Sequence, residues 1–425
     1  MQFAAAVALI FYHERCRNID QETIDTYVLQ LDEREDQASD RDLITAATFL
    51  WHTQQLKRAG QVVQKIIDVN PTSLTAHTLK GWIYLSASKE DLQNKALQYF
   101  EHVLNEDEGG NRKFLEALLG RAKVFEKMKK YEDCMEVLSE ISVCYPGFQP
   151  VGIEKAKVHI YSGEWDQALE SITAVMVRDK KNVEALRIYL FYLLARENDP
   201  ELVSEKFDEL IAALKATEGR NADLFYNISR LFARFCGRRE YVLTKTMEML
   251  NIAVSLQPEN AVYMCELGHQ MSMGGDWNNA YATFQQATAL DESFWLPLYG
   301  MIYCRIKQEM MDDAVQQLEF LAEIGDNQGK YAEHPFLEAM LEWRLKGNKT
   351  EAIRMLDSAL NVHIQQPKAA ATNLEFYIKL NADFLMQLAQ EYLIHCGAKP
   401  KISSAGPPKH LIKAIKLLEN VTKQN

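Results

Sequence analysis

The chain has 425 residues, of which 47% are hydrophobic and 25% are charged, and its formal net charge is −12. This balance is typical of a folded chain and not of a disordered one. The negative charge argues against nucleic acid or an anionic membrane as the main ligand, because either would repel the chain.

Small residues recur at a fixed distance inside helical patterns. Ala280 and Ala314 are 34 residues apart, and so are Cys134 and Ala168. A 34-residue period of helix–turn–helix units is typical of tetratricopeptide repeats. One such unit cannot bury its own apolar face, so successive units stack into a solenoid that binds other proteins along its surface. The sequence therefore predicts an all-α fold, a right-handed superhelix of helix–turn–helix pairs in a single array over residues 1–425.

The first predicted element is apolar. Phe3–Tyr12 is an uninterrupted apolar run, shorter than the ~20 residues that cross a bilayer, and only Gln2 stands where a signal peptide has basic residues. We therefore interpret 1–37 as a first or partial helical pair, with no membrane insertion. The following pairs are predicted at 40–73, 74–110, 115–148, 149–182, 183–217, 221–260, 261–294, 295–328, 333–366 and 382–422, which makes about ten to eleven in all.

The unit at 261–294 illustrates the packing that we expect. Gly268 and Ala280 are small, which predicts a close crossing of the first and second helices. Phe284 lies at helical spacing and is expected to fill the seam between them. Gly274–Asp276 is predicted to form the turn.

The sequence contains no motif of a catalytic, cofactor or metal site. The patterns G-x-x-x-x-G-K-[ST], G-x-G-x-x-G, H-E-x-x-H and G-x-S-x-G are all absent. His13 and Cys16 lie one helical turn apart but lack the second pair of ligands that a zinc site needs. The seven cysteines include no C-x-x-C, and their odd number favours reduced thiols. We predict a protein that is not an enzyme and uses neither cofactor nor metal.

Protein binding is the activity that the pattern favours, with the first helix of each pair lining a groove. Side chains at the second, fifth, ninth and twelfth places of a unit tend to face that groove. A carboxylate clamp of lysine and asparagine is not expected, because the fifth and ninth places hold no asparagine. Aromatic residues there predict an apolar, extended contact, with packing between neighbouring helices as the open alternative. The candidate binding residues are Trp82, Phe191, Phe225, Tyr299 and Tyr303.

Charge is unevenly distributed along the chain. Residues 1–40 hold nine acidic and three basic side chains, whereas residues 398–425 hold six lysines against Glu419 alone. Two interpretations are open: both ends are solvated faces, or the basic tail, with the loop Gly397–Pro408, docks on an acidic partner surface.

Several stretches resemble the tetratricopeptide repeat protein 21 family. The similarity covers nearly all 425 residues, in order and with the irregular turns included, so it is more specific than the 34-residue period. The stretches are Ala47-Thr-Phe-Leu-Trp-His52 followed by Ala59, Asn182-Val-Glu-Ala-Leu-Arg187, Leu224-Phe-Tyr-Asn-Ile-Ser229 running on into Cys236-Gly-Arg238, Glu266-Leu-Gly-His-Gln-Met271, Gln317-Leu-Glu-Phe-Leu321, and Tyr377-Ile-Lys-Leu-Asn381 with Asp383-Phe-Leu385.

The resemblance implies a non-enzymatic scaffold subunit of intraflagellar transport complex A, in the cytoplasm and in the cilium or flagellum. Such a subunit supports retrograde ciliary transport and the ciliary entry of membrane cargo. The implied partners are other complex A subunits, which are β-propeller and helical-repeat proteins, and ciliary cargo adaptors. Family members carry further repeats before the equivalent of Phe3 and beyond Asn425, so we expect a truncated or partial chain.

Two other classes of function stay open at this point. One is a peptide-binding co-chaperone. The other is the auxiliary subunit of an enzyme, such as an N-terminal acetyltransferase, whose solenoid wraps a catalytic partner.

Overall fold

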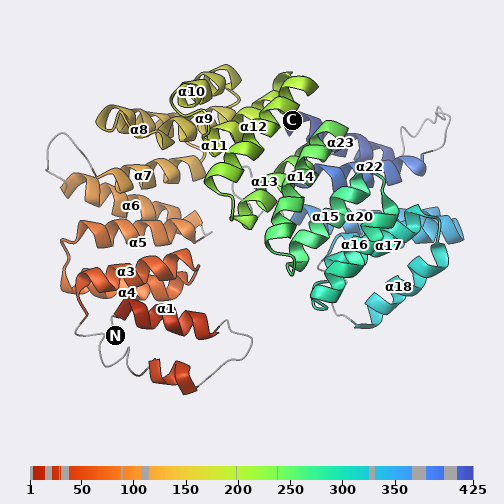
Figure 1. Ribbon diagram of the computed structural model, residues 1–425, viewed down its shortest axis with the longest axis horizontal. Helices are drawn as coiled ribbons and strands as arrows, with labels where there is room; N and C mark the ends of the chain where they lie inside the picture. Colours follow the sequence, from red (N-terminus) through yellow and green to blue (C-terminus); the bar gives the residue numbers. More distant parts are fainter. Residues whose placement is uncertain are drawn as a thin grey trace. The chain divides into compact units, whose positions relative to one another are not determined.

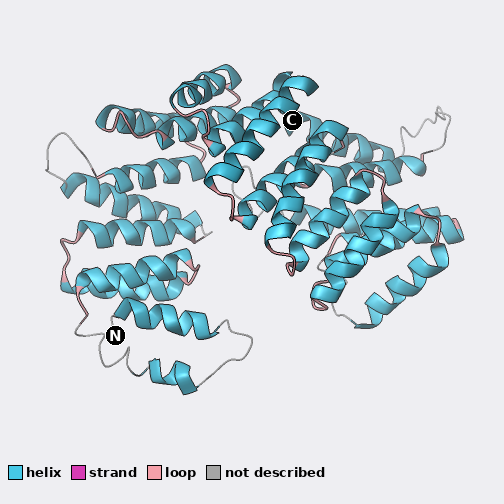
Figure 2. Cartoon of the chain, viewed as in Figure 1, coloured by secondary structure: helices cyan, strands magenta, loops and turns pink. Residues whose placement is uncertain are grey.

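The fold is all-α, as the sequence predicts. The computed structural model describes residues 3–14, 22–27, 29, 38–87, 90–106, 114–197, 199–236, 238–324, 331–365, 380–396 and 409–424, and within these ranges it contains helices, turns and no strand (Figure 2). Cys16 and the loop 397–408 lie outside the described residues. The prediction of stacked helix–turn–helix pairs is confirmed, and the handedness of the superhelix stays a prediction.

The chain divides into two compact units, which we call unit 1 (Met1–Ser171) and unit 2 (Ile172–Asn425). In unit 1 the helices follow one another as antiparallel pairs (Figure 1). Residues 22–27 form a short further helix. The helices that begin in unit 1 are α1 (Phe3–Glu14), α3 (Asp40–His52), α4 (Leu56–Val69), α5 (Leu74–Ser86), α6 (Glu90–Glu106), α7 (Leu115–Lys127), α8 (Tyr131–Cys144), α9 (Pro150–Ser162) and α10 (Trp165–Arg178), the last of which crosses the boundary.

Unit 2 continues the pattern with two irregular places. The first helices of two pairs end in single π-helical turns, η1 (Leu193–Glu197) and η2 (Glu342–Lys346), which the sequence pattern did not predict. The remaining helices are α11 (Val183–Tyr192), α12 (Pro200–Thr217), α13 (Ala222–Cys236), α14 (Glu240–Leu256), α15 (Ala261–Met273), α16 (Trp277–Leu290), α17 (Leu296–Lys307), α18 (Met311–Ile324), α19 (Glu333–Leu341), α20 (Lys349–Gln365), α22 (Ala382–Ile394) and α23 (Lys409–Gln424).

Local chemistry explains where the helices begin and turn. Asn260 caps α15, since its side-chain oxygen accepts from the backbone N–H of Val262 at 3.0 Å. The turn inside several pairs contains one residue in the left-handed region, where glycine is favoured. This residue recurs with the 34-residue period, as Lys129 and Gly163 and again as Gly275 and Glu309.

One phenylalanine of a second helix lies between two glycines of neighbouring first helices. A Cβ atom at Gly268 would lie 2.9 Å from the ring of Phe284, and one at Gly300 would lie 2.5 Å from it. The ring is 3% exposed, so these glycines are needed to make room for it. The predicted close crossing at Gly268 is thus confirmed. Phe100 lies between Gly81 and Gly120 in unit 1 in the same way.

None of the helices in the described part of the chain combines the length and the apolar character needed to cross a bilayer.

Candidate functional site

Three of the five predicted binding residues are buried. Phe191, Phe225 and Tyr299 are 1%, 0% and 4% exposed. Phe191 stacks on Phe235 with ring centroids 4.6 Å apart, and the Tyr299 ring lies 5.7 Å from that of Tyr331. Packing between neighbouring helices, the open alternative, accounts for the burial of these three side chains, and their contact with a partner stays a prediction.

Trp82 lies partly exposed on α5, the first helix of its pair in unit 1. Its ring is 6.0 Å from that of Trp51 on α3 and 5.6 Å from that of Phe100 on α6. Trp51 is also half-buried, and its Nε1–H donates to the hydroxyl of Ser86 at 2.7 Å. We call Trp51 and Trp82 the tryptophan pair. Trp51 was not among the predicted residues, although it stands at the twelfth place of the unit 40–73, one of the places expected to face the groove.

Charged side chains on α7 and α9 neutralise one another. The Nζ of Lys123 lies 2.5 Å from Glu126 and 3.2 Å from Glu154, and the Nζ of Lys157 lies 2.9 Å from Glu154. Burial alone would lower the pKa of Lys123, but the two carboxylates outweigh it and raise that pKa. Both lysines occupy the ninth place of their units, so their pairing agrees with the expectation that no carboxylate clamp is present.

In unit 2, α13 and α22 are in contact although they are far apart in the sequence. The Nε of Arg238 lies 2.5 Å from the Oδ1 of Asp383, whose Oδ2 accepts from Gln387 at 2.7 Å. Nearby, the guanidinium of Arg344 lies 3.1 Å from Glu391. Tyr303 and Lys307 on α17 complete what we call the inner cluster, which comprises Arg238, Tyr303, Lys307, Arg344, Asp383, Gln387 and Glu391.

Tyr303 is the second predicted binding residue that keeps an exposed part. It is half-buried, and the Nζ of Lys307 lies 5.2 Å from the centre of its ring. Burial raises the pKa of the Tyr303 hydroxyl, and burial lowers the pKa of Lys307. Burial thus favours the uncharged form of both side chains in this part of the inner cluster.

A polar network joins α13 to α15 in unit 2. Arg234 lies 2.8 Å from Glu266, and the side-chain amide of Gln270 donates to Ser229 at 3.0 Å. Burial, and then the guanidinium groups of Arg234, Arg238 and Arg230, hold the pKa of His269 well below its usual range. His269 is therefore neutral at physiological pH.

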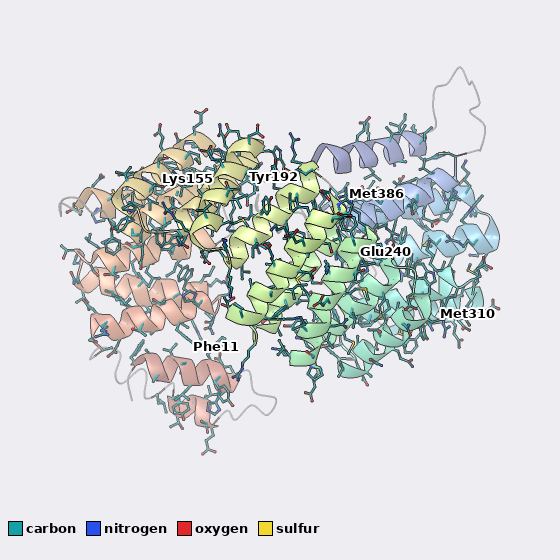
Figure 3. The ribbon with its side chains drawn as sticks, turned by 45° about the horizontal axis from the view of Figure 1, so that its top comes forward. Phe11, Lys155, Tyr192, Glu240, Met310 and Met386 are labelled. Atoms are coloured by element: carbon teal, nitrogen blue, oxygen red, sulfur yellow. The ribbon has the colours of Figure 1, made fainter. Side chains whose placement is uncertain are left out.

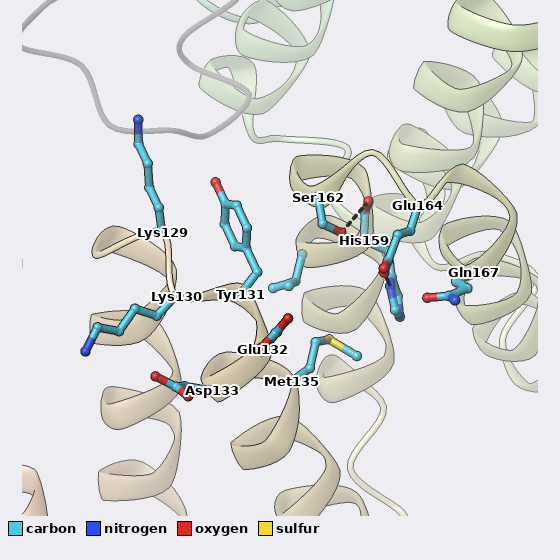
Figure 4. Close-up of a pocket in the computed structure, with 11 residues that line it drawn as sticks. Lys129, Lys130, Tyr131, Glu132, Asp133, Met135, His159, Ser162, Glu164 and Gln167 are labelled. Carbon is cyan, nitrogen blue, oxygen red and sulfur yellow. Dashed lines mark hydrogen bonds and ion pairs between the residues drawn. The ribbon is translucent and has the colours of Figure 1, made fainter.

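A shallow hollow of about 690 Å³ lies in unit 1, where the turns of two pairs meet (Figure 4). His159 and Glu164 form its best-defined contact, with the Nδ1 atom 2.7 Å from the carboxylate. The hydroxyl of Ser162 donates to the backbone carbonyl of His159 at 3.1 Å and not to its ring. The hollow is lined by Lys129, Lys130, Tyr131, Glu132, Asp133, Met135, Val158, His159, Ser162, Glu164 and Gln167.

In the part of the chain that the structure describes, no group of three or more His, Cys, Asp or Glu side chains could hold a metal ion. Cys134 and Cys304 are buried free thiols. Of the candidate binding residues, Trp82 in unit 1 and Tyr303 in unit 2 are partly exposed, and Trp51 beside Trp82 is partly exposed as well.

Comparison with known proteins gives the family. The model for the N-terminal ARM repeat of tetratricopeptide repeat protein 21 matches residues 1–169, and the model for its second ARM domain matches residues 205–425. The first match ends two residues before the boundary between unit 1 and unit 2. The two matched regions thus fall on the two units.

Individual relatives agree with these matches. Human tetratricopeptide repeat protein 21B is 35% identical over 425 residues, covering 100% of this chain and 32% of the relative. The mouse protein of the same name is 33% identical, covering 99% of this chain and 31% of the relative. The chain thus spans about a third of the length of these relatives. Among solved structures, a tetratricopeptide repeat protein from Parabacteroides merdae aligns with a TM-score of 0.43 at 12% identity, over 63% of this chain and 98% of that one. From the family matches, the chain belongs to the tetratricopeptide repeat protein 21 family.

Proposed function

We propose that the chain is a non-enzymatic scaffold that holds other subunits of intraflagellar transport complex A, and through them supports retrograde ciliary transport and the entry of membrane cargo into the cilium. The observation that carries the proposal is family membership over both units of the chain. The partners, the ciliary location and the transport role come from what the family resemblance implies.

Features of the surface support a scaffold. The exposed parts of Trp82, Trp51 and Tyr303 lie on first helices, where a solenoid presents its binding surface. Large aromatic side chains are the residues most often found to dominate protein interfaces. A partner would lay an extended segment or a helical tail across several repeats, with many modest contacts and a few aromatic anchors.

A co-chaperone that grips a free carboxylate fits the surface less well. Lys123 and Lys157 each lie within 3.2 Å of a carboxylate of this chain, so a peptide carboxylate would have to displace Glu154 or Glu126.

The test is affinity purification of the tagged chain from ciliated cells, with the bound proteins identified by mass spectrometry. Recovery of complex A subunits, at levels well above those with an unrelated helical-repeat protein, is the result we expect. Recovery of chaperones alone, or of a catalytic subunit with its activity, would replace the proposal with one of the other two classes of function.

A further inference from the structure

Three arginines are concentrated at the end of α13 in unit 2. Arg230 and Arg234 lie one helical turn apart, and Arg238 follows the last residue of the helix by two positions. We call these three residues the arginine row. Glu240 at the start of α14 and Met386 of α22 mark this part of unit 2 in Figure 3. The row gathers positive charge in a chain whose formal net charge is −12.

Fewer carboxylates than arginines pair with the row. The guanidinium of Arg234 lies 2.8 Å from Glu266, and that of Arg238 lies 2.5 Å from Asp383. The Nε of Arg230 is 4.0 Å from the same oxygen of Glu266, which is too far for a hydrogen bond. Three positive charges thus share two negative ones.

A further carboxylate lies near the row, but burial disfavours its negative charge. It belongs to Glu333 on α19, whose pKa is raised by burial, although Arg234 acts in the opposite direction. The other contact of Arg230 is with a neutral group, since its Nη1 donates to the hydroxyl of Tyr226 at 3.2 Å. Arg230 is therefore the arginine of the row whose charge is least compensated by these contacts.

Buried nitrogen atoms in and beside the row have no hydrogen-bond partner among the described residues. They are the Nε of Arg230, the Nη1 of Arg234 and the Nε2 of His269. The side chain of Arg234 is only 10% exposed. The two arginine atoms are donors in every state, and the histidine atom is a donor in one neutral tautomer and in the protonated form. Buried donors are normally hydrogen-bonded, so these groups favour an acceptor.

A buried water molecule is the simplest acceptor, because the Oε1 of Gln270 is also without a partner among the described residues and water both donates and accepts. The charges favour an anion over water. The charged groups that shift the pKa of His269 are the three arginines, whereas arginines and carboxylates both act on Tyr303 in the inner cluster. The electrostatic potential at His269 is therefore positive, which attracts a negative group.

We propose that an oxyanion, either a carboxylate or a phosphate group, binds to the guanidinium groups of Arg230 and Arg234 beside His269. The planar guanidinium presents its donors as a fork that matches the oxygens of both groups. Arg230 and Arg238 are 38% and 48% exposed, so an anion from solvent meets them first. The atoms without a partner are buried within unit 2, so this anion site does not depend on a free outer face.

The anion site goes beyond the proposed function, since it involves neither residue of the tryptophan pair and needs no other protein. The purified full chain is titrated with sodium phosphate and, separately, with sodium acetate, while sodium chloride keeps the ionic strength constant. The thermal unfolding midpoint is followed, because a ligand that binds only the folded chain raises it. We expect a saturable rise. Saturation with phosphate alone assigns a phosphate group, and saturation with acetate alone assigns a carboxylate.

Variants separate binding from general salt effects, because phosphate also stabilises folded proteins through its exclusion from their surfaces. Arg230→Gln should weaken the saturable binding at least tenfold. Arg305→Gln is the matched control in unit 2, because Arg305 also has a buried Nε without a hydrogen-bond partner among the described residues but lies over the ring of Tyr281 at 3.9 Å. It should bind as the unmodified chain does, and urea midpoints verify that both variants are folded.

The titration of His269, followed by NMR of its imidazole, tests the site without changing it. Its resonance is identified by its loss in His269→Gln. A bound anion favours the protonated imidazole, so the saturating salt should raise the pKa of His269. The proposal is overturned if neither salt gives a rise larger than in Arg230→Gln, if Arg305→Gln loses the rise equally, or if the pKa of His269 stays unchanged.

Discussion

The guanidinium of Arg238 and the carboxylate of Asp383 lie 2.5 Å apart across 145 residues of sequence. Arg238 follows α13 and Asp383 lies in the first turn of α22, so the pair joins the first helices of two distant helical pairs of unit 2. The side chain of Asp383 is 3% exposed, whereas that of Arg238 is 48% exposed. The buried carboxylate therefore depends on Arg238 and Gln387 for its charge to be compensated.

Replacing Arg238 by alanine should lower the free energy of unfolding of unit 2 by about 1–3 kcal/mol. The substitution leaves the buried carboxylate of Asp383 with the neutral donor Gln387. Because Arg238 is partly exposed, the loss of unfolding free energy should be smaller than for a fully buried ion pair. Urea titration followed by hydrogen exchange of unit 2 peptides measures the change. The control is Arg354→Ala, which removes an exposed partner of Glu351 and should leave the free energy of unfolding nearly unchanged, because solvent screens exposed ion pairs. Equal losses in the two variants would show that the contact between α13 and α22 contributes nothing.

Gly300→Ala should destabilise the chain by about 1–3 kcal/mol through overpacking, because the new methyl group would meet the buried ring of Phe284 at 2.5 Å. Gly60 is the matched control, since it too is helical and an added Cβ would have no neighbour closer than 3.8 Å. Gly60→Ala should be neutral or stabilising by up to about 1 kcal/mol, from helix propensity. Thermal unfolding of both variants gives the comparison, and a stabilising Gly300→Ala would contradict the packing described here.

The size of the residues at the repeat positions determines how the two helices of one pair pack together. The sequence therefore predicts this local packing well. Gly268, Ala280 and Phe284 lie where the pattern predicts a close crossing, since the two helices of a pair are neighbours in the chain. The pattern does not show that Gly300 of the next pair also contacts Phe284. That contact depends on how closely successive pairs stack. The pattern also does not predict the irregular turns η1 and η2, because a 34-residue pattern describes only the average unit.

His269 should make unit 2 less stable in acid. Its pKa is held well below 6.5 in the folded chain, first by burial and then by three arginines, and returns to about 6.5 on unfolding. Below pH 6.5 the unfolded chain binds a proton that the folded chain does not, so stability is present above this pH and is lost as the pH falls. One such histidine lowers the free energy of unfolding by up to about 1.4 kcal/mol for each pH unit below this value.

The measurement is the free energy of unfolding of unit 2 at pH 5, 6 and 7 for the unmodified chain and for His269→Gln. The variant should show the shallower slope, whatever its absolute stability at pH 7. The same slope in both proteins would mean that His269 accepts a proton readily in the folded chain.

The exposure of the candidate binding residues was harder to predict than the fold. Phe191, Phe225 and Tyr299 stand at places that face the groove in an average repeat, yet they are buried. The curvature of a solenoid arises from small rotations at every repeat, which sum over several pairs. In unit 2, α13 is in contact with α22, although the two helices are far apart in the sequence. Contacts between distant helical pairs therefore cannot be predicted from the sequence of any one repeat.

The proposed function requires partly exposed aromatic residues on the first helices to hold partner proteins. It is tested most directly by quantitative affinity purification of the tagged chain and of Trp51→Ala/Trp82→Ala from ciliated cells. The control, Val69→Ala/Val143→Ala, removes two apolar side chains that are 82% and 81% exposed on the second helices α4 and α8. We predict that the tryptophan variant recovers at least tenfold less of a complex A subunit than the unmodified chain does, and that the valine variant recovers as much. The urea midpoint of the tryptophan variant shows whether it is folded. Equal recovery of that subunit by the tryptophan variant and by the unmodified chain would contradict binding through Trp51 and Trp82.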